Sequence, residues 1–271
     1  MSKKSKYDVE YGFADQREKF SEKYIDFIQC MPNIKSAIDT VLKAARTKNR
    51  AQQVIWGLAR LAFEDEFQAM ILACANGYSH FAKQPLRALF EKVVTLLYLK
   101  NNPKDVQLYL KYRHILRYRQ LQRLPGSTRD AKTRRNIRRN YKNNKSKFPN
   151  KSRWHKKTIP EMAKEVGIPD SFIELAYYNA LQEAHPSLIA ILHRYDWKPD
   201  GSLWWKDDLP PVEESEDTLK IAHFFVLKAL EEIKNYFKVK SADEILSECA
   251  KDYLRAWNIP NPSGTTTLIS C

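Results

Sequence analysis

The sequence predicts an all-α fold, a multi-helix bundle with a basic, partly irregular insertion and one small β-hairpin. Only 7 of the 271 residues are glycine, and the segments between prolines are rich in residues that lose little conformational freedom in a helix. Apolar residues recur along these segments at three- and four-residue spacing, which places them on one helical face. We therefore expect one helical domain at residues 14–257, with flexible ends at residues 1–13 and 258–271.

The first part of the chain is predicted to form three helices. Phe20 and Phe27 share one face of the first helix, and Pro32 is expected to end it, because proline lacks an amide hydrogen and clashes with the preceding turn. Asn76-Gly77 after the third helix is a typical helix stop. The expected ranges are 14–31, 33–46 and 51–75.

A strongly apolar segment at residues 85–100 is predicted to be the central helix of the bundle. Pro85 suits a first helical turn, and Asn101-Asn102-Pro103 ends the segment. Apolar side chains surround so much of this helix that burial on several sides is expected. A further helix at residues 104–124 leads into the basic part of the chain.

The second half is predicted to contain further helices, at residues 158–166, 171–184, 216–237 and 242–257. Pro186 is expected to break or kink the chain after His185, because the residue before a proline is disfavoured in the α region. Ser241 and Glu244 are spaced as in a capping box, which predicts the start of the last helix.

One hairpin is predicted at residues 195–207. Pro199-Asp200-Gly201 lies between aromatic residues, and this composition is typical of a tight turn between two strands. The tryptophans on either side of the turn are expected to pack the hairpin against the bundle. These are Trp197, Trp204 and Trp205.

Cysteine spacing and hydropathy indicate the compartment. Cys30, Cys74, Cys249 and Cys271 are far apart, with no C-x-x-C pair and no histidine at ligand spacing, so we expect reduced thiols, no metal site and no cofactor. No run of about 18 apolar residues occurs, and no apolar segment follows the Lys-rich N-terminus. We therefore expect a cytoplasmic protein with no membrane partner.

Positive charge is concentrated in the middle of the chain. The formal net charge is +14, and residues 127–157 hold 13 Lys and Arg with Asp130 as their single acid. The basic residues just upstream are interleaved with Tyr109, Tyr112 and Tyr118, which suits single-stranded nucleic acid, because bases can stack on rings while cations follow the phosphates. We predict nucleic-acid binding by residues 111–157, with RNA favoured over DNA. The candidate binding residues are Arg113, Arg117, Arg119, Arg134, Arg135, Arg138, Arg139, Lys142 and Lys145.

The same concentration of positive charge is also consistent with a solvated loop. A partly disordered surface segment is often rich in charge, which keeps a protein soluble without binding a ligand. Charge alone does not distinguish RNA from DNA, or either from an acidic protein or an anionic lipid.

Short motifs in the chain resemble a bacterial family. Arg87-Ala-Leu-Phe-Glu91 in an apolar helix ending Leu97-Tyr98-Leu99, then Met162-Ala-Lys-Glu-Val-Gly167, and Tyr178 followed by His185-Pro186-Ser187 resemble the domain of unknown function 5677. The resemblance covers about half the chain, residues 63–195. It implies an all-helical fold and a looser kinship with helical nucleotide-associated domains of bacterial toxin and phage-defence systems, without an established activity.

That kinship suggests a candidate ribonuclease site. Ribonucleases of the higher eukaryote and prokaryote nucleotide-binding type share an Arg followed, after a short spacer, by a His, and no histidine of this chain has an arginine at that distance. A metal-independent endoribonuclease would therefore assemble its site from separate helices. His185 would act as general acid or base, Glu91 would orient its ring, and Arg87 would hold the phosphate.

A structural interpretation of the same residues stands beside the catalytic one. Arg87 and Glu91 would pair four residues apart within the bundle, while His185 would cap a kinked helix. Three candidate functions follow. The first is a nucleic-acid-binding helical protein, acting as a ribonuclease effector of a bacterial toxin or phage-defence system. The alternative is a non-catalytic helical module that binds an acidic partner, a defence-system protein or a second copy of itself. The third candidate is an enzyme that acts on a small phosphorylated molecule near Arg87.

Overall fold

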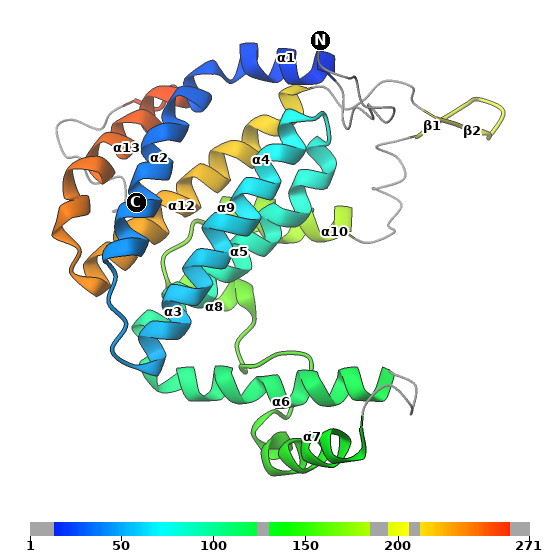
Figure 1. Ribbon diagram of the computed structural model, residues 1–271. Helices are drawn as coiled ribbons and strands as arrows, with labels where there is room; N and C mark the ends of the chain where they lie inside the picture. Colours follow the sequence, from blue (N-terminus) through cyan, green and yellow to red (C-terminus); the bar gives the residue numbers. More distant parts are fainter. Residues whose placement is uncertain (1–13, 124–129, 185–194, 206–211, 261–271) are drawn as a thin grey trace, which may run out of the picture.

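The computed structural model describes residues 14–123, 130–184, 195–205 and 212–260. Most of this chain is helical, which confirms the predicted all-α class. The bundle is arranged around α5 (Ser79–Asn101), against which α3 (Arg50–Arg60), α4 (Phe67–Ala75), α10 (Ala180–Ala184) and α12 (Glu216–Phe237) pack (Figure 1). Every residue from Val93 to Leu99 is buried, so α5 is the central helix that its apolar composition predicted.

The N-terminal helices break at Tyr24 and not at Pro32. α1 (Ala14–Lys23) is followed by α2 (Ile25–Ala44), which contains Pro32 in its interior. The prediction that Pro32 ends a helix was therefore wrong. α2 packs against α13 (Asp243–Ala256) and buries Phe27 and Ile34 on either side of the proline, and this burial outweighs the roughly 3 kcal/mol that an interior proline costs.

Residues 50–75 form one continuous helical segment with a wider turn in its middle. α3 is followed by the π-helical turn η1 (Leu61–Glu66) and then by α4. The segment ends where Asn76-Gly77 predicted, because Gly77 adopts a left-handed φ of 76° and Tyr78 N donates to Ala73 O. α5 then begins at Ser79, so Pro85 lies inside the helix and not in its first turn as expected.

The basic segment is more regular than the sequence indicated. After the turn η2 (Pro103–Asp105), α6 (Val106–Arg123) runs across one end of the bundle, and α7 (Ala131–Asn144) lies beside it (Figure 1). Asp130 caps α7, because its side chain accepts a hydrogen bond from Thr133 N at 2.8 Å. The expectation of an irregular insertion was therefore wrong for residues 131–144.

The remaining described elements are short turns and helices around the bundle and a pair of three-residue strands. Strands β1 and β2 pair antiparallel, with Tyr195 opposite Trp205. Trp197 and Trp204 are 58% and 54% exposed, so these two rings do not pack the strands against the bundle as expected. Ser241 lies in a 3-10 turn and caps no helix, so the predicted capping box is absent, and α13 begins at Asp243. The element bounds are η3 (Lys145–Lys147), α8 (Ile159–Glu165), α9 (Asp170–Ile173), η4 (Glu174–Asn179), β1 (Tyr195–Trp197), β2 (Leu203–Trp205), η5 (Val212–Ser215) and η6 (Lys240–Ala242).

The cysteines of the bundle are reduced. Cys30, Cys74 and Cys249 are buried free thiols, as expected, whereas Cys271 lies outside the described residues. Among the described helices, none combines the length and the apolar character that a membrane crossing requires.

Candidate nucleic-acid interface

α6 and α7 form a pair of helices with positive formal charge only. α6 carries five Lys and Arg, α7 carries six, and neither carries an acid. Apart from Arg134, no cation of these two helices is paired with a carboxylate in the part of the chain that the structure describes. Seven of the predicted binding residues are exposed and Arg119 and Arg134 are half-buried. The exposed ones are Arg113, Arg117, Arg135, Arg138, Arg139, Lys142 and Lys145.

The tyrosines of α6 pack against protein and do not offer open stacking surfaces. Tyr118 stacks on Tyr141 of α7, with ring centroids 3.8 Å apart. Tyr112 packs against Phe148, and its hydroxyl donates to the Lys151 carbonyl. Tyr109 meets Trp154 in an edge-to-face contact. The expectation that bases stack on these tyrosines is therefore not supported, because their ring faces hold α7 and the segment after it in place.

A buried polar cluster fixes the segment after α7 to the end of α5. Tyr98 donates from its hydroxyl to Asp105 Oδ2 at 3.2 Å and lies 3.4 Å from His155 Nε2. Lys157 N donates to His155 Nδ1, so the neutral ring carries its proton on Nε2, 3.5 Å from Asp105 Oδ2. Burial lowers the pKa of His155, and Asp105 partly offsets this, while burial and Asp105 raise the pKa of Tyr98 to about 12.

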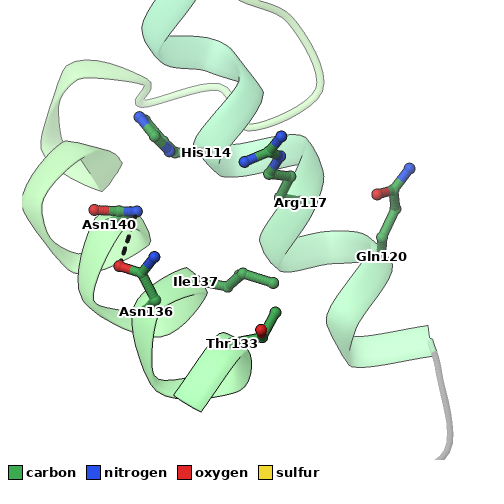
Figure 2. A pocket seen from close by; sticks show the side chains of 7 residues that line it. All are labelled: His114, Arg117, Gln120, Thr133, Asn136, Ile137 and Asn140. Carbon is green, nitrogen blue, oxygen red and sulfur yellow. Dashed lines mark hydrogen bonds between the residues drawn. The ribbon is translucent and has the colours of Figure 1, made fainter. Parts of the chain in front are cut away.

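A cavity of about 460 Å³ lies between the two cationic helices (Figure 2). His114, Arg117 and Gln120 line it from α6. Burial, followed by the charges of Arg113 and Arg117, lowers the pKa of His114, so the ring is neutral at pH 7. From α7, the lining residues are Thr133, Asn136, Ile137 and Asn140.

Two of the four lining residues from α7, Asn136 and Asn140, carry amide groups. Asn136 Oδ1 accepts hydrogen bonds from Asn140 Nδ2 at 3.4 Å and from Arg139 Nη2 at 3.1 Å. Asn136 Nδ2 and Asn140 Oδ1 have no hydrogen-bond partner within the described ranges, which leaves one NH2 group to donate to a ligand and one carbonyl oxygen to accept from it. No carboxylate of the described residues lines the cavity.

A second cavity, of about 360 Å³, lies on the other side of His114, between α3 and α6. Its cations are Arg50 from α3 and Lys111 and Arg113 from α6, and His114 lines both cavities. The ammonium group of Lys111 lowers the pKa of the Lys147 ammonium, because the two like charges lie close together. Arg50, Gln53, Val54, Gln107, Leu110, Lys111, Arg113 and His114 form the lining.

Two of the three candidate catalytic residues lie within the described part of the chain. Arg87 Nε lies 2.9 Å from Glu91 Oε1, and its guanidinium lies 4.7 Å from the centre of the Tyr177 ring. Arg87 and Glu91 therefore pair on one face of α5, as the structural interpretation expected. His185 lies outside the described residues, so its distance to this pair is not defined.

The sequence indicated the basic residues, including Arg117 of the cavity, but not the uncharged residues of the lining. His114, Gln120, Asn136 and Asn140 carry no charge at neutral pH and form no known motif. The signal that could have found them is the four-residue spacing of Asn136 and Asn140, which places two amides on one face once residues 131–144 are known to be helical.

These features define a helical-bundle protein with a cationic helix pair at one end. The model of a family of unknown function, DUF5677, matches residues 65–202, which include α6, α7, Arg87 and Glu91. The chain belongs to this family, as its motifs predicted. A search of curated proteins and a search of solved structures each found no match.

Proposed function

We propose that this protein binds nucleic acid, with RNA favoured over DNA, through the exposed cations of α6 and α7. The proposal rests on the pairing of two helices that bear only positive formal charge. Apart from Arg134, none of their cations is paired with a carboxylate of the described residues.

The energetic reason is mutual repulsion between the helices. Like charges held within a few ångströms destabilise the folded arrangement, and a bound polyanion converts this repulsion into attraction. Phosphates that replace condensed counterions supply a large, sequence-independent part of such binding. RNA is favoured because the uncharged amides beside the cations suit the edges of unpaired bases, which RNA presents in loops and single strands.

The test is a binding titration with labelled single-stranded RNA and DNA at two salt concentrations. Wild-type affinity should fall steeply as salt rises, and replacing Arg134, Arg135, Arg138 and Arg139 by Ala should weaken binding to all sequences. The matched control removes four exposed cations of the bundle, Lys19, Lys43, Lys164 and Lys251, and therefore changes net charge equally. If both quadruple variants lose the same affinity, α6 and α7 are not the interface.

Ribonuclease activity is the catalytic part of the proposal. Arg87 contacts both the Glu91 carboxylate and the Tyr177 ring, which positions its guanidinium rather than leaving it mobile. An effector role in a toxin or phage-defence system is the setting that the resemblance implies. His185→Ala should abolish RNA cleavage while leaving binding and the unfolding transition unchanged, and a variant that unfolds instead would assign His185 a structural role.

Exposed apolar side chains favour the second candidate, a helical interaction module. Leu72 on α4 and Phe81 on α5 are 63% and 62% exposed, and Trp197 and Trp204 are exposed as well. Such a module would bind an acidic protein or a second copy of the chain. Light scattering with Leu72→Ser and Phe81→Ser tests it, because loss of a complex at unchanged RNA affinity would support this function over the first.

A further inference from the structure

The two cavities beside His114 have complementary chemistry. The α6–α7 cavity offers uncharged donors and acceptors from Asn136, Asn140 and Gln120, together with the apolar side chain of Ile137 (Figure 2). A nucleobase has this same combination of properties, with flat apolar faces and an edge of alternating donors and acceptors. A lining with no carboxylate from the described residues also suits a ligand that is joined to phosphates.

The α3–α6 cavity has the chemistry of an anion site. Arg50, Lys111 and Arg113 face it from two helices that are not adjacent in sequence. Lys111 also lowers the pKa of the Lys147 ammonium by like-charge repulsion, and an anion beside Lys111 would reduce that repulsion. His114 lines both cavities, so the two sites adjoin at this side chain.

We propose that the α6–α7 cavity holds one unpaired nucleobase and that the α3–α6 cavity holds a phosphate of the same strand. This inference rests on the proposed function, and it names the ligand as single-stranded. A base within a duplex has its Watson–Crick edge occupied by its partner, so it cannot present that edge to Asn136 and Asn140. A cavity of about 460 Å³ is within the range of small-molecule sites and is large enough for one base.

A neutral ring suits the position of His114 between the base and the phosphate. Burial, followed by the charges of Arg113 and Arg117, lowers the pKa of His114, and the neutral ring offers one donor and one acceptor between the base and the phosphate. Arg117 lines the base cavity and has no hydrogen bond or ion pair with any residue of the described ranges, so its guanidinium is available to the ligand.

The experiment compares matched pairs of variants of the full chain. Asn136→Leu replaces the amide in the cavity by an apolar group with the same branching, and Asn143→Leu makes the same change at an exposed position of α7 outside the cavity. Arg117→Gln and Arg123→Gln each remove one charge from α6, and only Arg117 lines the cavity. The probes are an unstructured single-stranded RNA, the same RNA as a duplex, and inorganic polyphosphate, which has no bases.

We expect wild-type protein to bind the single strand about tenfold more tightly than the duplex. Asn136→Leu and Arg117→Gln should each weaken single-strand binding about tenfold, and their controls by about threefold or less. Asn136→Leu should leave polyphosphate binding unchanged. Thermal unfolding of each variant identifies a folding defect, and Arg117→Gln, at an exposed position, keeps the test decisive if Asn136→Leu does not fold.

The outcomes separate the two proposals. Equal affinity for single strand and duplex, or equal losses within each matched pair, would overturn the cavity assignment while leaving charge-driven binding intact. If wild-type protein shows no salt-sensitive binding to any nucleic acid, the proposed function fails, and the cavity assignment fails with it.

Discussion

The rings of Tyr118 on α6 and Tyr141 on α7 lie parallel, with centroids 3.8 Å apart and planes 10° apart. This stack joins two helices that carry cations and no acids, and Ile137 is the buried residue of α7. A small apolar contact therefore holds α7 in place against like-charge repulsion.

Tyr141→Ala is expected to loosen α7 selectively. Losing the stack should destabilise the α6–α7 contact by about 2 kcal/mol, because both the ring pairing and the buried ring area are lost. Hydrogen exchange should accelerate at residues 131–144 and stay unchanged in α5. The control is Tyr178→Ala, which removes an exposed ring from η4. Equal exchange rates in α7 for the two variants would mean that the stack does not hold this helix.

Tyr98→Phe is expected to weaken the attachment of the segment after α7. The change removes the hydroxyl that donates to Asp105 and leaves a half-buried carboxylate with one donor fewer. We expect a loss of about 1 to 2 kcal/mol in the free energy of unfolding, measured by denaturant titration. Tyr253→Phe is the matched control, because no hydrogen bond joins that hydroxyl to the described residues, and it should cost clearly less.

Acid should destabilise the protein through His223. This ring is fully buried, accepts a hydrogen bond from Trp257 Nε1 at 3.2 Å, and has its pKa lowered from 6.5 to about 3 by burial. Between these two values the unfolded state binds a proton that the folded state does not. The free energy of unfolding should therefore fall as pH falls below about 6.5, by up to roughly 1.4 kcal/mol per pH unit from this one group.

His223→Gln provides the comparison, because an amide oxygen can still accept from Trp257 but does not titrate. Urea titrations at pH 7 and pH 5 should show a smaller loss of stability for the variant than for wild type. If the two proteins lose stability equally, His223 is not the group responsible.

Cys30, Cys74 and Cys249 are expected to resist thiol reagents in the folded protein. Burial raises the pKa of the Cys74 and Cys249 thiols to about 12, so both thiols are protonated at neutral pH. Their burial also keeps a reagent from reaching them. Mass spectrometry after alkylation should find these three residues unmodified in native buffer and fully modified in concentrated guanidinium chloride. Rapid native modification of Cys74 would show that α4 opens far more readily than its packing implies.

The main helices could be predicted from the sequence because their apolar pattern and end signals agree. The range expected at residues 216–237 coincides with α12, and Asn76-Gly77 ends the helical segment where predicted. The central position of α5 followed from its composition. In each of these elements, local preference and tertiary packing favour the same structure.

Where local and tertiary preferences disagree, the predictions were wrong. Pro32 and Pro85 each lie inside a helix, because the buried faces on either side of the proline continue in register and their packing outweighs the local cost. α7 was missed because its sequence lacks an apolar pattern. Its 14 residues bury Ile137 and are otherwise mostly polar, so no apolar period marked it as a helix. The cavity depends on how α7 meets α6, which no local pattern in the sequence describes.

The two π-helical turns, η1 and η4, both pack against α5. A π-helical turn contains about one residue more than an α-helical turn, so it is how a helix accommodates a single-residue insertion without breaking. Glu66 of η1 pairs with Lys92 of α5, and Tyr177 of η4 lies against the guanidinium of Arg87, also on α5. Deleting one residue from either turn would restore ordinary helix and move the side chains within the turn, Tyr177 of η4 among them, to new positions. The contact between Arg87 and the Tyr177 ring therefore depends on the length of η4 as much as on the identity of any residue in it.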